Sequence, residues 1–228
     1  MLRELIHLAR HAPSVLALQQ KLDQTELYDT LMQRADDAGM YARRSALVSD
    51  LHLLGRGAPR ARDVLEIGCG TGMMFAHYGE GARVRAIDVD DAFLERARTR
   101  ARSFITLENA DALALPMPDA SFDAVVACLV LCSIPDARRA LAEARRVLRP
   151  GGELRLIEHV VSDRRVPRAL MHAADPLWLW LNHQGCHMDR DTVASVREVF
   201  PNVEITERFQ IWSAGLPAFP MLTLRAPK

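Results

Sequence analysis

LEIGCGTG, residues 65–72, joins an apolar, strand-like run to three glycines at alternate positions. Glycine tolerates positive φ and lets a ligand lie against bare backbone, so such a turn at a strand end is typical of a nucleotide-type site. The spacing differs from the dinucleotide fingerprint G-x-G-x-x-G, because Met73 stands where that pattern has its last glycine. No P-loop Lys followed by Ser or Thr is present. The turn therefore predicts a nucleotide-like ligand that presents no phosphate here.

Two periodicities alternate along the rest of the chain. Residues 14–53 have apolar positions three and four apart, which predicts helices, and no strand is expected before Asp63. Beyond it, short apolar runs alternate with helical patterns, and one run is apolar enough for a central parallel strand. The expected strands span residues 63–68, 83–88, 104–109, 122–131, 153–160, 203–210 and 219–227, and helical patterns occupy 73–78, 90–103, 135–148 and 190–200.

This alternation predicts an α/β fold, namely a doubly wound, Rossmann-like sheet of seven strands with helices on both faces. The last two strands leave almost no room for a helix between them, so an antiparallel hairpin is expected at the sheet edge. Residues 1–60 are expected to form a helical lid and residues 61–228 the ligand-binding domain. Residues 164–190 interrupt the alternation, which predicts an insert over the site.

The charge balance excludes one class of partner. Lys plus Arg and Asp plus Glu both number 29, so the formal net charge is zero. Without excess positive charge there is no field to attract nucleic acid, and no such partner is expected. The N-terminal residues contain no unbroken apolar run of about 20 residues, so stable membrane insertion is not expected either. The oligomeric state stays open.

The four cysteines form no CxxC pair and have no His at zinc-finger spacing, so no metal site is expected. Three of them lie in or beside expected strands. Free thiols favour a reducing compartment, and the predicted location is cytoplasmic.

Three carboxylates follow or flank the glycine turn. Asp88 lies 20 residues beyond Gly68 at the end of the next strand, where a carboxylate can accept both hydroxyls of a ribose. Asp111, after the third strand, could accept from an adenine amino group. Glu66 would lie near any cationic part of the ligand. Asp88 and Asp111 together are suited to a nucleoside, and Glu66 to a cationic part of the ligand if there is one.

The successive motifs resemble those of class I S-adenosylmethionine (SAM)-dependent methyltransferases. The resemblance rests on five stretches between residues 63 and 159, in the family's order and spacing: DVLEIGCGTG, AIDVD, NADALALP, FDAVVACLVLCSIPD and RVLRPGGELRLIEH. It implies SAM as the cofactor. It also implies that the methionine portion is lined by Glu66, Gly68, Cys69 and Gly70, the ribose and adenine edge by Asp88 and Val89, and the adenine by Asp111 and Ala112.

The same resemblance implies two further cofactor contacts. Leu129 follows the fourth strand and is expected to face the cofactor. An upstream tyrosine closes over the cofactor in many relatives, and Tyr28 and Tyr41 are the candidates, although either could simply pack within the helical lid.

A later stretch, ADPLWLWLNHQGCHMDRDT, is similar to the thiol S-methyltransferases of this superfamily. The matching residues are Asp175, Pro176, Trp178, Gly185 and Cys186. The resemblance implies a small-molecule acceptor methylated on a heteroatom, with sulfur first and then oxygen or nitrogen. The apolar, membrane-anchoring N-terminus of those enzymes has no match here. Alternatives are a quinone C-methyltransferase, a phospholipid N-methyltransferase and a SAM-binding protein without turnover.

His159 ends the fifth strand, at the rim of the expected site. A neutral imidazole there could take a proton from a thiol, hydroxyl or amine acceptor, which makes His159 the catalytic candidate. Trp178, His183 and Cys186 in the insert are the candidates for acceptor contacts, with loop packing as the alternative. His183, Cys186 and His187 lie within five positions, but their spacing matches no standard zinc pattern.

Overall fold

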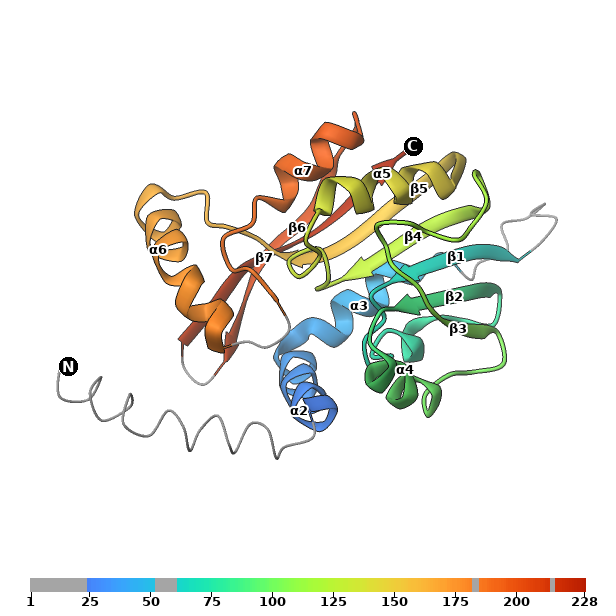
Figure 1. Cartoon of the computed structure of the whole chain (residues 1–228), viewed down its shortest axis with the longest axis horizontal. Coiled ribbons are helices and arrows are strands. Elements are labelled where there is room, and N and C mark those ends of the chain that lie inside the picture. The colour runs from blue at the N-terminus through green and yellow to red at the C-terminus, as the bar shows by residue number, and fades with distance from the viewer. Residues whose placement is uncertain (1–23, 52–60, 182–184, 214–215) are drawn as a thin grey trace.

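The computed structural model describes residues 24–51, 61–181, 185–213 and 216–228. Figure 1 shows one twisted sheet with helices on both faces. Its strands are β1 (Arg62–Ile67), β2 (Ala82–Asp88), β3 (Ile105–Asn109), β4 (Phe122–Cys128), β5 (Leu148–His159), β6 (Glu204–Ser213) and β7 (Leu216–Pro227). The helical segments are α2 (Gln24–Ala35), η1 (Asp36–Met40), α3 (Tyr41–Val48), η2 (Phe75–His77), α4 (Asp91–Arg98), α5 (Ala137–Val147), α6 (Arg165–Leu181) and α7 (Thr192–Val199).

The strand order β3-β2-β1-β4-β5-β7-β6 confirms the doubly wound α/β prediction. The first five strands are parallel neighbours, while β7 runs antiparallel to both β5 and β6. The chain leaves β1 toward β2 on one side and returns to β4 on the other. Such a reversal of strand order opens a crevice at the carboxyl ends of the strands.

Each face of the sheet has its own buried cluster. On one face, α5 and α7 cover the sheet with Leu141 and Val196 among the buried side chains. On the other, α3, η2 and α4 pack around Leu47, Phe75 and Leu94. Figure 1 shows α5 and α7 on one side of the strands and α3 and α4 on the other.

The first connection is shorter than the sequence predicts. Residues 73–78 were expected to open a helix, but only the single 3-10 turn η2 forms there. Gly72 and the strand β2 are separated by residues 73–81 alone, which is too little chain for a helix and two loops. The Phe75 ring folds back against Gly72, where a side chain on residue 72 would clash with it.

The insert contains a helix, α6, with Pro176 inside it. On a helix, residues 178 and 180 point to different sides, and Trp178 is half-buried while the Trp180 side chain is exposed. Of the helices that the structure describes, none is long and apolar enough to cross a bilayer.

Candidate cofactor and acceptor site

The glycine turn after β1 packs between the loop after β4 and the helix α2. Gly68 and Gly70 have φ of +65° and +53°, a conformation that favours glycine. A Cβ on Gly68 would clash with the Val130 side chain, and a Cβ on Gly70 would lie 3.5 Å from the Tyr28 hydroxyl. The bare backbone at Gly68 therefore lets the loop after β4 approach closely, whereas Gly70 meets α2 at ordinary contact distance.

Asp88 joins this turn to the next one. Its Oδ2 accepts a hydrogen bond from the Gly70 amide at 2.8 Å, and its Oδ1 accepts from the Asp90 amide at 3.0 Å. Burial raises the pKa of Asp88, and the two amides oppose that rise. Asp90 in turn caps α4 by accepting from the amides of Ala92 and Phe93, as its position predicted.

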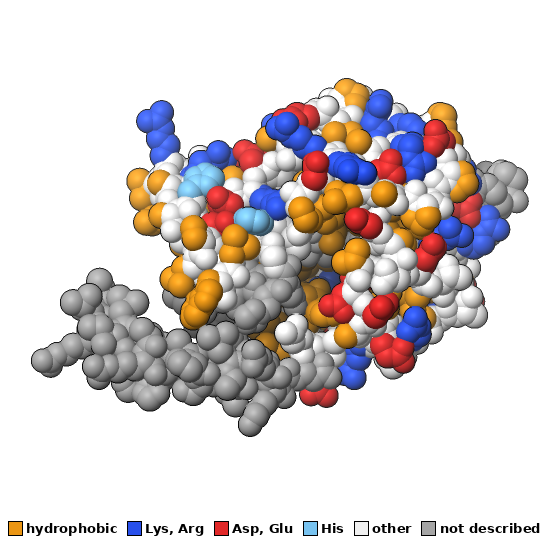
Figure 2. Space-filling model, in the orientation of Figure 1, with side chains coloured by type: hydrophobic (Ala, Val, Ile, Leu, Met, Phe, Trp, Pro, Cys, Tyr) orange, Lys and Arg blue, Asp and Glu red, His pale blue; other side chains and the backbone are white. Residues whose placement is uncertain are grey.

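A cavity of about 360 Å³ lies at the carboxyl ends of β1, β2, β3 and β4. That volume is within the range of small-ligand sites. Figure 2 shows this face hollowed near its centre, with hydrophobic and acidic side chains around the hollow. Seven of the predicted cofactor residues line the cavity: Tyr28, Gly68, Asp88, Val89, Asp111, Ala112 and Leu129.

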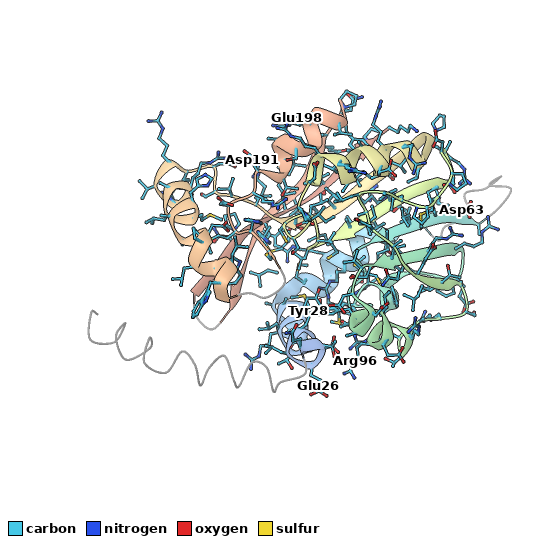
Figure 3. The ribbon with its side chains drawn as sticks, in the orientation of Figure 1. Glu26, Tyr28, Asp63, Arg96, Asp191 and Glu198 are labelled. Atoms are coloured by element: carbon cyan, nitrogen blue, oxygen red, sulfur yellow. The ribbon has the colours of Figure 1, made fainter. Side chains whose placement is uncertain are left out.

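The other predicted cofactor residues lie differently. Gly70 forms the turn beside the cavity, and Cys69 is buried behind it. The Tyr41 ring is 56% exposed and packs edge-on against His77, with ring centroids 4.6 Å apart. Tyr28, not Tyr41, is thus the tyrosine at the cavity. Figure 3 shows Tyr28 and Arg96 where α2 and α4 meet.

Glu66 is a buried carboxyl group, only 2% exposed. Burial raises its pKa to about 8, although the Tyr78 hydroxyl and the Arg44 guanidinium work in the opposite direction. Its Oε2 has no hydrogen-bond partner of normal length among the described residues. A buried acceptor without a donor is costly, so this oxygen has unused capacity for a donor or cation.

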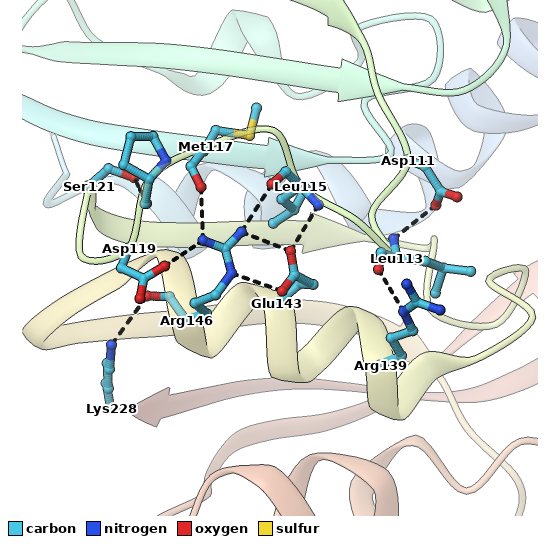
Figure 4. A network of polar contacts seen from close by, with 11 residues as sticks. Asp111, Leu113, Leu115, Met117, Asp119, Ser121, Arg139, Glu143, Arg146 and Lys228 are labelled. Carbon is cyan, nitrogen blue, oxygen red and sulfur yellow. Dashed lines mark hydrogen bonds and ion pairs between the residues drawn. The ribbon is translucent and has the colours of Figure 1, made fainter.

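The loop that carries Asp111 and Ala112 is anchored to α5, as Figure 4 shows. Arg146 donates to the carbonyl groups of Leu115 and Met117 and to the Glu143 carboxylate. Asp111 Oδ1 accepts from the Leu113 amide at 2.8 Å. This network holds the expected adenine wall in place.

Asp29, which the sequence did not single out, ties α2 to the glycine turn. Its carboxylate accepts from the Thr71 hydroxyl at 2.6 Å, from Arg96 at 3.0 Å and from Arg100 at 2.7 Å. Arg100 also donates to the Thr71 carbonyl oxygen. The helix bearing Tyr28 is therefore clasped to α4 and to the turn it covers.

The loop after β4 is shaped by Glu158. This fully buried carboxylate accepts at Oε1 from the amides of Val130 and Leu131, both at 2.8 Å, and burial raises its pKa to about 7. Leu129, beside these amides, has φ of +58°, which is rare for a leucine. Strained backbone of this kind gathers at functional sites. The sequence shows Glu158 beside His159 at the end of β5, but it does not show which groups Glu158 would contact.

A second group of side chains lies behind that loop and unites residues predicted separately. His159 Nε2 is 3.0 Å from Cys186 Sγ, and the Trp178 indole acts on the same sulfur. The Cys132 thiol donates toward Cys186 and, together with His159, lowers the pKa of Cys186 to about 5 against the effect of burial. Cys132, which directly follows the expected fourth strand, is thus part of this group. His183 falls outside the described residues.

Asp175 on α6 positions Cys186. Its carboxylate accepts from the Met188 amide at 2.7 Å and pairs with His187 Nδ1 at 2.8 Å. The His187 amide donates to the Cys132 carbonyl oxygen at 3.0 Å. The backbone directly after Cys186 is therefore joined to α6 and to the loop after β4.

A further cavity, of about 450 Å³, lies at the opposite end of the sheet. Residues such as Asp63, Val84 and Phe122, at the amino ends of their strands, line it. Ligands of open parallel sheets bind at the carboxyl ends, so the glycine-turn cavity is the candidate site.

Comparisons with known proteins agree with this geometry. A family model described as a methyltransferase domain matches residues 65–156. The thiol S-methyltransferase TMT1B of Rattus norvegicus is 34% identical over 179 residues, which cover 73% of this chain and 70% of that protein. The chain belongs to the class I SAM-dependent methyltransferases.

Two other relatives of this methyltransferase widen the comparison. The phosphatidylethanolamine N-methyltransferase of Cereibacter sphaeroides is 32% identical, over 70% of this chain and 79% of that protein. The crystal structure of the YcgJ protein of Bacillus subtilis superposes with a TM-score of 0.66 at 16% identity, over 82% of this chain and 98% of that one. The latter shows the fold alone.

The residues of the methyltransferase fit SAM as its cofactor. The cavity offers Asp88 at the end of β2 and a bare glycine turn, while Glu66 keeps one buried oxygen without a donor. When bound, SAM supplies an electrophilic methyl group on a sulfonium sulfur. The chain's own residues then orient the cofactor, exclude water and place the acceptor in line with that methyl group.

Proposed function

We propose that this methyltransferase transfers the methyl group to the sulfur of a small-molecule thiol. The observation that carries the proposal is the 34% identity with a thiol S-methyltransferase over 73% of the chain. The group formed by His159, Cys186 and Trp178 supports it, because this group lies directly behind the loop that lines the cofactor cavity.

The proposed chemistry is an in-line displacement. The sulfur of the acceptor attacks the methyl carbon, and the electron pair of the breaking bond stays on the sulfur of S-adenosylhomocysteine. A thiolate is the nucleophile, so the acceptor must lose its proton first. We propose that His159 promotes that loss. Trp178 and Cys186 would contact the acceptor, as would His183.

The cofactor contacts are proposed as the sequence predicted them, with Tyr28 as the closing tyrosine because it lines the cavity. We further propose that residues 1–60 act as a lid and that residues 164–190 cover the acceptor. The clasp of Asp29 on Arg96 and Arg100 supports the first part of that proposal. The contacts of α6 with Cys186 through Trp178 and with Met188 through Asp175 support the second.

The test is a matched acceptor panel. Purified protein is incubated with SAM and equal concentrations of aliphatic thiols, aryl thiols, phenols and amines, and S-adenosylhomocysteine and methylated products are quantified by mass spectrometry. We expect thioethers as the main product. Turnover confined to phenols or amines would overturn the choice of sulfur while leaving the methyltransferase assignment intact.

A phospholipid amine is the second candidate acceptor, because of the 32% identity with a phosphatidylethanolamine N-methyltransferase. The same assay with phosphatidylethanolamine vesicles separates the two. N-methylated lipid without any thioether would favour this second function. A quinone substrate with C-methylation as the readout completes the panel.

A further inference from the structure

Three metal-binding atoms converge behind the loop that lines the cofactor cavity. Cys132 Sγ, His159 Nε2 and Cys186 Sγ all lie within 4.8 Å of one another. They come from three separate segments: the loop after β4, the end of β5 and the chain after α6. Two thiols and an imidazole are the ligands that zinc prefers, and three protein ligands are typical of catalytic rather than structural zinc.

The geometry is close to that of a tetrahedral site. Zinc–sulfur and zinc–nitrogen bonds of about 2.3 and 2.0 Å place neighbouring ligand atoms roughly 3.5 Å apart. His159 Nε2 and Cys186 Sγ are 3.0 Å apart, so a bound ion requires these two atoms to separate by about half an ångström. Side-chain torsions supply such a movement without a change of backbone.

Neighbouring residues also hold the backbone of the ligands in place. Asp175 and the Cys132 carbonyl oxygen accept from the two backbone amides that directly follow Cys186, those of Met188 and His187. Cys132 is buried, and its loop is clamped by Glu158. Ligands whose backbone is already in place lose little entropy when an ion binds.

The fourth coordination position of such a zinc site can face the acceptor. Cys132 lies between Val130 and Ser133, which both line the cofactor cavity. An ion on Cys132 would therefore be bound by the same loop that lines the cavity in which SAM is expected. The described residues supply three ligands and no fourth in this group, and an open position is what a catalytic zinc site keeps for a substrate.

We propose that Cys132, His159 and Cys186 bind a zinc ion whose open position receives the sulfur of the acceptor thiol. The acceptor half of this proposal rests on the proposed S-methyltransferase function, whereas the metal site does not. Two thiolates, one neutral imidazole and Zn²⁺ sum to zero charge, so burial of the occupied site costs little.

The reaction at the site balances without a further reagent. The acceptor thiol binds zinc and releases its proton to solvent, because the cation stabilises the thiolate. A sulfur lone pair then forms the bond to the methyl carbon, and the bond from that carbon to the sulfonium sulfur breaks, with its electron pair going to S-adenosylhomocysteine. The neutral thioether is a weak ligand and leaves. His159 thus promotes loss of the proton through the ion.

Another group of possible ligands, Asp175, His187 and Asp189, lies nearby. Its atoms already serve the fold: Asp175 holds the Met188 amide and His187, and Asp189 pairs with His172 at 2.7 Å. A substitution in this second group therefore serves as the control that tells which of the two groups binds the ion.

The first test measures zinc binding alone. Reduced, metal-free protein is titrated with Zn²⁺ against a chromogenic chelator, and with Co²⁺, whose thiolate charge-transfer band reports sulfur ligation. We expect one ion per chain. Cys132→Ser, Cys186→Ser and His159→Ala should each weaken binding by more than about 100-fold, since even changes around metal ligands cost roughly 10- to 100-fold.

Cys128→Ser and Asp189→Asn are the controls and should bind zinc like the wild type, with thermal melting as the check on folding. Binding that survives loss of Cys132 or Cys186, or that disappears only in Asp189→Asn, would overturn the site. So would a wild type that shows no cobalt–thiolate band.

The second test needs no variant. Alkylation of the cysteines by iodoacetamide is followed by mass spectrometry with and without Zn²⁺. Cys132 is already buried, so Cys186 carries the readout: zinc should slow its alkylation and leave the rate at Cys128 unchanged. An unchanged rate at Cys186 would contradict the proposal. Thioether formation by protein that binds no zinc would refute the inference and keep the proposed function. Zinc binding without thiol methylation would keep the metal site and refute both the proposed function and the role of the open position in binding the acceptor.

Discussion

At the residue scale, carboxyl groups organise the cofactor site, each in a different way. Asp88 lies in the cavity wall with both oxygens already accepting backbone amides. Glu66 is buried beneath the glycine turn with one oxygen free of donors among the described residues. Asp88 is suited to the ribose because it is held in position. Glu66 is suited to a cation because its Oε2 accepts no hydrogen bond from the described residues.

Replacing Asp88 tests the ribose contact. We expect Asp88→Ala to raise the SAM dissociation constant at least 100-fold, because two hydrogen bonds to a charged acceptor are lost, together about 3 kcal/mol. The Gly70 amide also loses its acceptor. Calorimetry is the measurement, with the exposed Glu95→Gln on α4 as the control. Near-wild-type affinity would remove Asp88 from the site.

Glu66 makes SAM binding depend on pH. With a pKa of about 8, the free protein holds this carboxyl mostly protonated at neutral pH. A cation nearby favours the carboxylate, so binding should release a proton, and affinity should rise as pH increases toward 8. Titration calorimetry in buffers of different ionisation enthalpy measures the released proton. Glu66→Gln should bind without release, and an equal release in this variant would exclude Glu66 as its source.

At the element scale, a single side chain, Asp29, holds the helix α2 over the cavity. Asp29 spans the Thr71 hydroxyl and the guanidinium groups of Arg96 and Arg100. Both arginine side chains are partly exposed, and α2 gives them an acidic partner. The packing of Tyr28 on Phe93, with centroids 5.2 Å apart, follows from that clasp.

Loosening the clasp tests whether α2 acts as a lid. Asp29→Ala should weaken SAM binding about tenfold, or roughly 1.4 kcal/mol, because partly exposed ion pairs contribute modestly and several are lost together. Hydrogen exchange of the α2 amides should speed up in the same variant. Glu26→Ala, an exposed change on the same helix, is the control. Faster exchange without weaker binding would argue against a lid.

At the scale of the whole molecule, buried acids set the pH dependence of stability. Burial raises the pKa of Glu66 to about 8 and that of Glu158 to about 7. Each of these pKa values lies above that of an unfolded glutamate, about 4.3, so the folded state holds more protons between those values. Their contribution to stability is therefore complete at low pH and is lost as pH rises. Asp50 acts oppositely, because Arg155 lowers its pKa to about 2.

The ligand-free protein should accordingly be most stable near pH 5, with its free energy of unfolding falling toward pH 8. Chemical denaturation across that range measures the effect. The double variant Glu66→Gln, Glu158→Gln should show a flatter profile. A variant whose profile keeps the wild-type slope would assign the dependence to other groups.

Local patterns predicted most of the fold. Strand and helix periods, the glycine turn and the spacing to Asp88 act over a few residues, so they can be read along the chain. The one expected helix that failed, at residues 73–78, failed because the strand β2 begins too soon after it. The position of Tyr28 at the cavity, and not Tyr41, depended on how α2 and α3 pack.

By itself the sequence determined the class of fold, the cofactor and the carboxyl edge at which it binds, since these follow from motif order and periodicity. Only the tertiary structure placed Cys132, His159 and Cys186 together, and gave Asp29 and Glu158 their partners. The reason is physical: parallel strands deliver distant loops to one edge, but which side chains meet there depends on packing between them.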